Sequence, residues 1–239
     1  MGTKIKTLSR KLKMKEQISA LATLISTLVL PATQLAGPLL SPIPKIQEIA
    51  LAEQSLDLTT REPNAYANQV FANNILLALH YLKEDIDSPK IDWYWVRKPF
   101  EVSFTLQPDE VFAFHANVLP EFTEPVKTMN SRFFIEEGYK SVGGLGGNGV
   151  CHLASLINWV ASEVRLDSPS SVRRVGLEVT APANHNFAPV PGVPEEYGTS
   201  IRSQSKNQNL YIRNDSGSSV KFIFTIKGQM VNLRIVTPV

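Results

Sequence analysis

The sequence predicts an α+β fold: a single mixed domain with antiparallel strands and a cysteine-bearing helix that follows a glycine-rich loop. Three observations lead to this prediction. Residues 64–83 and 150–164 carry apolar side chains at helical spacing, residues 100–106 alternate between apolar and polar, and residues 210–235 contain short apolar runs separated by turns. The chain has 239 residues, of which 43% are hydrophobic and 19% charged, enough apolar material for one core.

The first 40 residues are predicted to be a signal peptide or membrane anchor. Residues 1–16 hold six basic residues and one acid, and the uncharged stretch Ile18–Leu30 follows. Extended to Leu40, the uncharged stretch has 23 residues, marginally enough for one membrane span. This pattern favours export or anchoring over an amphipathic soluble helix. By the positive-inside rule we expect an extracytoplasmic protein, secreted or attached to the membrane through this segment.

The rest of the chain has a different charge balance. Without residues 1–16 it holds 18 basic and 21 acidic residues, a net charge of −3. A nucleic-acid-binding body needs an excess of basic surface, so we expect no nucleic-acid partner. Cys151 is the single cysteine and cannot form an internal disulfide.

A proline-rich stretch, residues 41–63, is predicted to be a linker, so the domain is expected to span residues 64–239. Asn64 follows Pro63 and is a suitable N-cap for a helix that ends near Lys83. The apolar stripe of this helix consists of Phe71, Ile75, Leu79 and Leu82. It is expected to pack against the rest of the domain.

Aromatic and imidazole side chains follow close to this stripe. His80 is expected to be a solvated or core histidine rather than a ligand. Trp93 and Trp95 flank a tyrosine in a cluster that either packs the helix on the sheet or stacks on sugars, and packing is the commoner use.

Strands are predicted in two parts of the chain. Residues 100–106 are predicted to form one strand, and after a turn at Pro108-Asp109 a short strand follows at Val111–Phe114. The C-terminal third supplies Leu210–Arg213, Val220–Ile226 and residues 231–235, the last two joined as a hairpin by Lys227-Gly228.

Cys151 is the most informative residue, because it lies in the first turn of the predicted helix Val150–Val164, directly after the glycine-rich segment 143–149. Unpaired N–H groups and the dipole at a helix N-terminus favour a thiolate, so the sequence predicts a lowered pKa for this thiol. Glycines let a substrate backbone come near, and their amides can stabilise an oxyanion. The candidate oxyanion or substrate loop consists of Gly147, Asn148 and Gly149.

A cysteine nucleophile needs a base, and His185, in a polar loop ahead of the last strands, is the candidate. The candidates for orienting its ring are Asn184, Asn186 and Glu178, and the sequence does not choose among them. His152 is adjacent to Cys151 and points about 100° away on a helix, which makes it an accessory candidate. The alternative is that Cys151 is a small buried residue that allows tight packing.

The same residues predict neither a metal site nor a cofactor. Cys151, His152 and His185 match no standard zinc spacing. The glycine-rich loop lacks the Gly-Lys-Ser/Thr ending of a phosphate-binding loop.

Six short motifs between about residues 100 and 236 resemble, in the same order, those of VanW-like proteins. The motifs are Pro108–Phe114 (PDEVFAF), Gly138-Tyr139, Gly147–Ser155 (GNGVCHLAS), His185 with Pro189 and Pro191, Tyr197-Gly198, and Leu210–Asn214 (LYIRN). His152 stands where that family usually has glutamine. The resemblance adds Tyr197 to the accessory residues and supports a functional role for Cys151.

VanW-like proteins are bacterial cell-envelope proteins, exported or anchored, and their namesake is encoded with vancomycin-resistance genes. Their activity is not established, so the resemblance implies association with peptidoglycan or its peptide stems without naming a reaction. It leaves three functions open: an envelope factor that binds these ligands, a Cys151–His185 hydrolase or acyltransferase that acts on them, and a non-catalytic module that contacts a protein partner the sequence does not identify.

Overall fold

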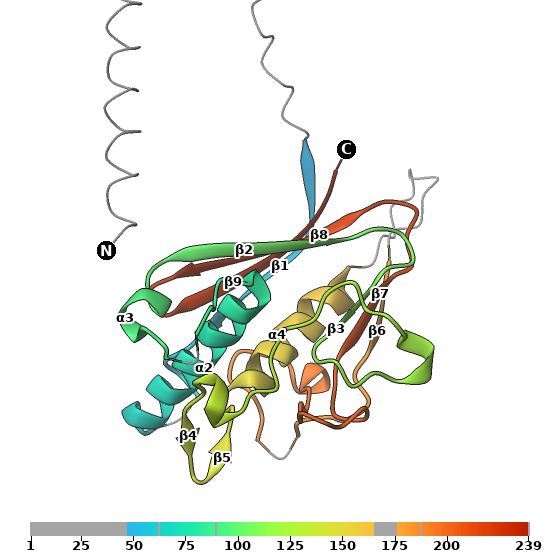
Figure 1. Ribbon diagram of the computed structural model, residues 1–239. Helices are drawn as coiled ribbons and strands as arrows, with labels where there is room; N and C mark the ends of the chain where they lie inside the picture. Colours follow the sequence, from blue (N-terminus) through green and yellow to red (C-terminus); the bar gives the residue numbers. More distant parts are fainter. Residues whose placement is uncertain (1–46, 62, 89, 165–175, 187, 239) are drawn as a thin grey trace, which may run out of the picture. The chain divides into compact units, whose positions relative to one another are not determined.

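The computed structural model describes residues 47–61, 63–88, 90–164, 176–186 and 188–238, and Figure 1 shows them as a mixed α+β fold with antiparallel sheets. In chain order the elements are β1 (Glu48–Asp57), α2 (Ala65–Lys83), α3 (Trp93–Val96), β2 (Phe100–Leu106), β3 (Val111–Ala113), η1 (Pro120–Phe122), η2 (Ile135–Glu137), β4 (Ser141–Val142), β5 (Leu145–Gly146), α4 (Val150–Glu163), β6 (Leu177–Thr180), η3 (Glu195–Tyr197), β7 (Tyr211–Asn214), β8 (Val220–Lys227) and β9 (Met230–Pro238). The predicted signal peptide or anchor, residues 1–40, lies outside the described residues. None of the helices that the structure describes is long and apolar enough to cross a membrane.

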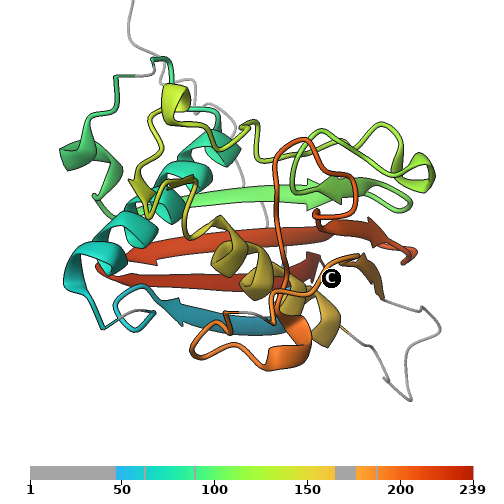
Figure 2. The same ribbon diagram turned by 90° about the horizontal axis from the view of Figure 1, so that it is seen from below.

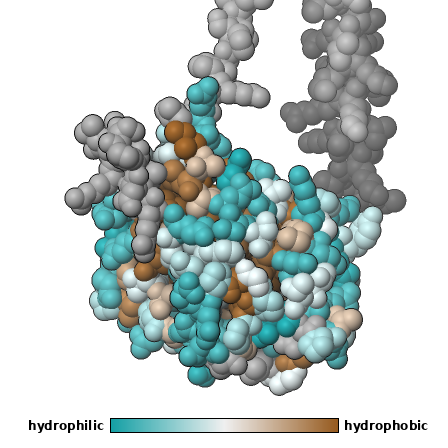
Figure 3. Space-filling model, turned by 180° about the vertical axis from the view of Figure 1, so that it is seen from behind, coloured by the Kyte–Doolittle hydropathy of each residue, from teal (hydrophilic) through white to brown (hydrophobic). Residues whose placement is uncertain are grey.

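The main sheet has the strand order β1-β9-β8-β2, with every neighbouring pair antiparallel. Helices α2 and α4 lie on one face of it (Figures 1 and 2). Along β2 the side chains of Val102, Phe104 and Leu106 are buried and alternate with exposed neighbours, which is the period-two pattern that predicted this strand. A view from behind shows a mostly hydrophilic surface with small, interrupted hydrophobic patches (Figure 3).

The prediction of a linker at residues 41–63 was wrong for Glu48–Asp57, which forms β1. This strand pairs with β9 from Glu48 opposite Pro238 to Asp57 opposite Met230, with an irregularity between Ala50 and Ala52. Residues 45–239 form one compact unit, so the domain begins well before residue 64. The flanking prolines suggested a linker, but the stretch between them contains none.

Helix α2 begins directly after Asn64, the predicted N-cap. The Oδ1 atom of Asn64 accepts hydrogen bonds from the backbone N–H groups of Tyr66 (2.8 Å) and Ala67 (3.3 Å), which satisfies two of the N–H groups that a helix start leaves without partners. Ile75, Leu79 and Leu82 of the predicted stripe are buried, whereas Phe71 is partly exposed.

The aromatic residues after α2 pack against the protein itself. His80 is buried and lies between the rings of Trp95 and Phe100, with centroids 4.3 and 4.0 Å away. The ring of Trp93 is covered by the ammonium group of Lys140 at 4.2 Å. These contacts confirm that His80 is a core histidine. They also show that Trp93 and Trp95 pack within the protein, so stacking on a sugar is not needed to explain these two residues.

A smaller sheet, with the order β3-β7-β6, lies beside the main one. Phe104 of β2 links the two, because its ring stacks on Phe112 of β3 (5.1 Å between centroids) and on Phe222 of β8 (4.6 Å). The predicted C-terminal hairpin is confirmed as β8 and β9, joined at Gly228-Gln229. The strands β1, β4, β5 and β6 were not predicted.

Candidate functional site

A cavity of about 780 Å³ lies at the N-terminal end of α4, and we call it the cysteine pocket. It is lined by Arg61, Phe71, Arg132, Phe133, Phe134, Gly147, Asn148, Gly149, Val150, Cys151, His152, His185, Ala188, Ser200, Ile201, Arg202, Ser203, Gln204 and Gln208. The pocket therefore brings together Cys151, His185, His152 and the three predicted loop residues, although they come from segments more than thirty residues apart. This size is typical of a small-ligand site.

The two loop glycines are required by contacts within the protein. Gly149 has a φ of +105°, and a Cβ atom on it would lie 2.7 Å from the carbonyl oxygen of Phe71. Gly147 has a φ of +66°, and its Cβ would lie 2.9 Å from that of Phe133. Close approach to Phe71 and Phe133 thus explains both glycines, where the sequence suggested close approach to a substrate.

Asn74, a residue that the sequence did not single out, fixes this loop from helix α2. Its Nδ2 donates to the carbonyl oxygens of Lys140 (2.9 Å) and Asn148 (2.8 Å), and its Oδ1 accepts from the N–H of Lys140 (2.8 Å). The Oδ1 atom of Asn148 accepts from the N–H of Val142 at 2.9 Å, so this side chain stabilises the loop. A buried asparagine on an apolar helix face was the signal for Asn74, because such a side chain must find partners.

The Cys151 thiol is held by the backbone of Ile201. Its Sγ accepts from the N–H of Ile201 (3.3 Å) and donates to the carbonyl oxygen of the same residue (3.6 Å), a pair of contacts that suits the protonated thiol. Burial raises the pKa of Cys151, against the smaller opposing effects of nearby backbone N–H groups and of Arg61. The predicted direction was therefore wrong, because desolvation outweighs the helix N-terminus.

His152 is paired with Arg61. The Nε of Arg61 lies 2.7 Å from the Nε2 of His152, and since a guanidinium only donates, Nε2 is the acceptor and the ring is neutral with its proton on Nδ1. Burial first, then the charges of Arg61 and His185, lower the pKa of His152 to about 3. This ring is consequently not a base for the thiol at neutral pH.

His185 lies beside His152, with ring centroids 6.2 Å apart. The backbone N–H of His185 donates to the carbonyl oxygen of Gly198 at 3.0 Å. Burial lowers the pKa of His185, so its imidazole is also neutral at pH 7. The other two accessory candidates do not line the pocket: Asn184 donates to the carbonyl oxygen of Glu195 (3.4 Å), and Tyr197 stacks on Trp159 (6.5 Å).

Three arginines, which sequence reasoning missed, give the cysteine pocket its charge. Arg61 is partly buried, whereas Arg132 and Arg202 lie exposed at the rim. No aspartate or glutamate stands among the described lining residues. In the part of the chain that the structure describes, no three His, Cys, Asp or Glu side chains are grouped so that they could hold a metal ion.

Comparisons with family models, with curated proteins and with solved structures found no match to this chain. The resemblance to VanW-like proteins therefore stays a prediction from short motifs.

Proposed function

We propose that this protein is a VanW-like envelope protein, secreted or anchored through its N-terminal segment, that binds carboxylate-bearing peptides in the cysteine pocket without transforming them. The peptide stems of peptidoglycan are the ligands that the motif resemblance suggests, and they carry free carboxylates. The observation that carries the proposal is the charge of the pocket: three arginines and no carboxylate line it. Guanidinium groups are the side chains best suited to bind carboxylates.

The state of the thiol and the imidazoles favours binding over catalysis. Burial raises the pKa of the Cys151 thiol and lowers the pKa of the His152 and His185 imidazoles, so proton transfer from the thiol to either ring is unfavourable. The positive charge of the pocket at neutral pH then comes from the arginines alone. We expect a ligand to be attracted by the rim residues Arg132 and Arg202, and this attraction to weaken with added salt because both side chains are exposed.

The proposal is tested by calorimetric titration of the full chain in mild detergent with a soluble peptidoglycan stem peptide and with the same peptide after amidation of its carboxylates. We expect the free acid to bind and the amidated form to bind at least tenfold more weakly. The double variant R132A/R202A should bind the free-acid peptide about tenfold more weakly than the wild type does. Arg234→Ala is the matched control, because Arg234 is an exposed arginine on β9 outside the pocket. Equal affinity for the two peptides, or for the double variant and the wild type, would contradict the proposal.

A cysteine-dependent hydrolase or acyltransferase is the second candidate, because Cys151 and His185 line the same pocket. It requires a thiol that ionises readily and responds to His185. The rate of alkylation by iodoacetamide against pH distinguishes the two functions. For a binding protein we expect a thiol pKa above its usual range and the same profile in His185→Ala. A lowered pKa that rises in that variant would instead establish an activated pair.

A further inference from the structure

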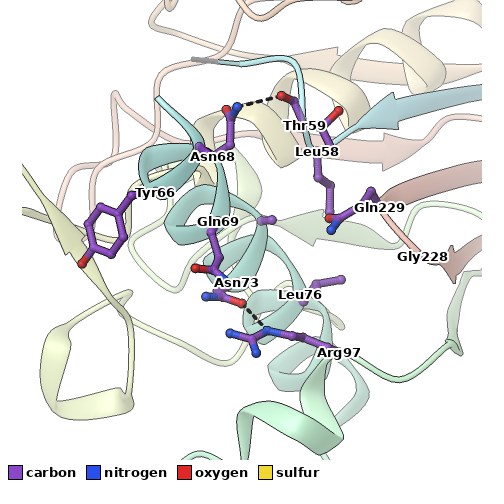
Figure 4. Close-up of a pocket in the computed structure, with 12 residues that line it drawn as sticks. Leu58, Thr59, Tyr66, Asn68, Gln69, Asn73, Leu76, Arg97, Gly228 and Gln229 are labelled. Atoms are coloured by element: carbon purple, nitrogen blue, oxygen red, sulfur yellow. Dashed lines mark hydrogen bonds between the residues drawn. The ribbon is translucent and has the colours of Figure 1, made fainter. Parts of the chain in front are cut away.

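A second cavity, of about 760 Å³, lies apart from the cysteine pocket and shares no lining residue with it. Four exposed or partly exposed parts of the fold form it: the end of β1, one face of α2, the β8–β9 turn and Arg97 after α3 (Figure 4). We call it the carboxamide pocket, because three of its lining residues from α2 and one from the turn are amides: Asn68, Gln69, Asn73 and Gln229.

Asn73 is the unusual residue in this pocket. It is 1% exposed, and its Oδ1 accepts a hydrogen bond from the Nε of Arg97 at 2.9 Å. Because a guanidinium only donates, this contact fixes which end of the carboxamide is oxygen. Figure 4 shows the nitrogen directed away from Arg97. That Nδ2 is buried and has no hydrogen-bond partner among the described residues.

An unpartnered buried donor destabilises the protein, so a ligand that supplies an acceptor oxygen there would gain binding free energy from this hydrogen bond. Gln69 lies one turn earlier on the same helix face and is exposed. Its unbranched side chain can shift to let an acceptor reach Asn73, which otherwise has almost no exposed surface.

The remaining lining residues define the chemistry of that ligand. Arg97 is the single charged residue among the twelve, against three arginines in the cysteine pocket, so carboxamides rather than charged groups make up most of the polar lining. Each carboxamide offers both a donor and an acceptor, as a hydroxyl group does. Leu58, Ala72 and Leu76 add apolar surface of the kind that the C–H face of a sugar ring covers.

We propose that the carboxamide pocket binds an uncharged saccharide, with a ring hydroxyl or carbonyl oxygen accepting from Asn73 Nδ2 and the apolar ring face lying on Leu76 and Ala72. The volume suits a ligand of one to three sugar rings, because small-ligand sites are about 300–1,000 Å³. This site is independent of the peptide binding proposed above, since the two cavities are lined by different residues.

The test is calorimetric titration of the full chain with four uncharged trisaccharides: chitotriose, maltotriose, cellotriose and mannotriose. We expect at least one to bind, and Asn73→Leu and Gln69→Ala each to weaken that binding at least tenfold. Gln69→Ala is the safer variant for folding because Gln69 is exposed. Gln107→Ala, an exposed glutamine outside the pocket, is the matched control and should leave the affinity unchanged within twofold.

Three results would overturn the proposal: no trisaccharide binds at millimolar concentration, Gln69→Ala binds as the wild type does, or amidated trialanine binds at this site in place of the sugars. The variant R132A/R202A separates this inference from the peptide-binding proposal. It should leave saccharide affinity unchanged while it weakens peptide binding, so failure of one proposal leaves the other standing.

Discussion

Burial and the contact with Arg61 together keep His152 neutral inside the cysteine pocket. Arg61 donates through Nε, His152 accepts through Nε2, and the imidazole is kept neutral far below its usual pKa. A second cation at this position would be repelled by Arg61 and would lose its hydration on burial. Protonation of His152 is therefore coupled to unfolding.

This coupling has a defined pH window. The folded-state pKa of His152 is about 3, against 6.5 for a solvated histidine, so the unfolded chain binds the extra proton between these pH values. Stability is full above about pH 6.5 and falls as the pH decreases toward 3. From pH 7 to pH 4 the loss is about 3 kcal/mol from this group alone.

His152→Gln isolates that contribution, because a glutamine Oε1 can replace Nε2 as the acceptor for Arg61 without titrating. We expect urea unfolding of the variant to depend less on pH between 6.5 and 4, with about 3 kcal/mol less variation than in the wild type. Parallel pH profiles of the two proteins would show that the histidine is not neutral in the folded state. The variant at pH 7 is the control for any direct effect on packing.

Residue-level predictions from the sequence succeeded where the cause is local. Asn64 caps the helix that directly follows it, so its role could be predicted from neighbouring residues. The buried stripe of α2 could be predicted from the spacing of its apolar residues. The direction of the Cys151 pKa shift was wrong because desolvation depends on what the fold places around the sulfur. Arg61, Arg132 and Arg202 were missed because only the tertiary structure brings them to one cavity.

At the scale of elements, the start of α4 depends on two glycines packed against neighbouring backbone. Gly149→Ala places a Cβ atom 2.7 Å from the oxygen of Phe71 at a φ of +105°, so both strain and overlap oppose it. We expect a loss of about 3 kcal/mol or more in the free energy of unfolding. Denaturant unfolding followed by circular dichroism measures it.

Gly143→Ala is the matched control for that change. Gly143 has a φ of +66° in the β4–β5 turn, but nothing lies within 4 Å of an added Cβ. The free energy of unfolding of this variant should fall by only about 1 kcal/mol, because alanine adopts a positive φ less readily than glycine. Equal losses in the two variants would mean that the approach of α2 to the α4 N-terminus does not constrain Gly149.

Strands were predicted where alternation is strong and missed where it is weak. β2 alternates buried and exposed residues throughout, and β8 and β9 meet at a two-residue turn, so both were found. β1 is an edge strand with a single buried residue, Leu56, and its pattern resembles that of a polar linker. β6 is four residues long, too short for periodicity to identify.

On the scale of the whole molecule, β1 decides where the folding unit begins. A chain that starts at Lys45 keeps all of β1, whereas one that starts at Asn64 removes it and uncovers β9, whose Val231, Leu233 and Ile235 are fully buried. We expect the 45–239 fragment to melt cooperatively and the 64–239 fragment to be insoluble or unfolded, because an uncovered edge also promotes aggregation. Expression, solubility and thermal melting of the two fragments check this. A soluble 64–239 fragment that melts at the same temperature would restore the linker interpretation.

The pairing of the first and last strands has a topological consequence. Glu48 lies directly opposite Pro238, so residues at the two ends of the described domain are about 5 Å apart between their Cα atoms. A linker of a few residues could join them into a circular backbone without disturbing the sheet. New ends could then be opened in the exposed β4–β5 turn at Gly143-Gly144, giving a circular permutant in which the strand order β1-β9-β8-β2 is retained although β1 follows β9 along the chain.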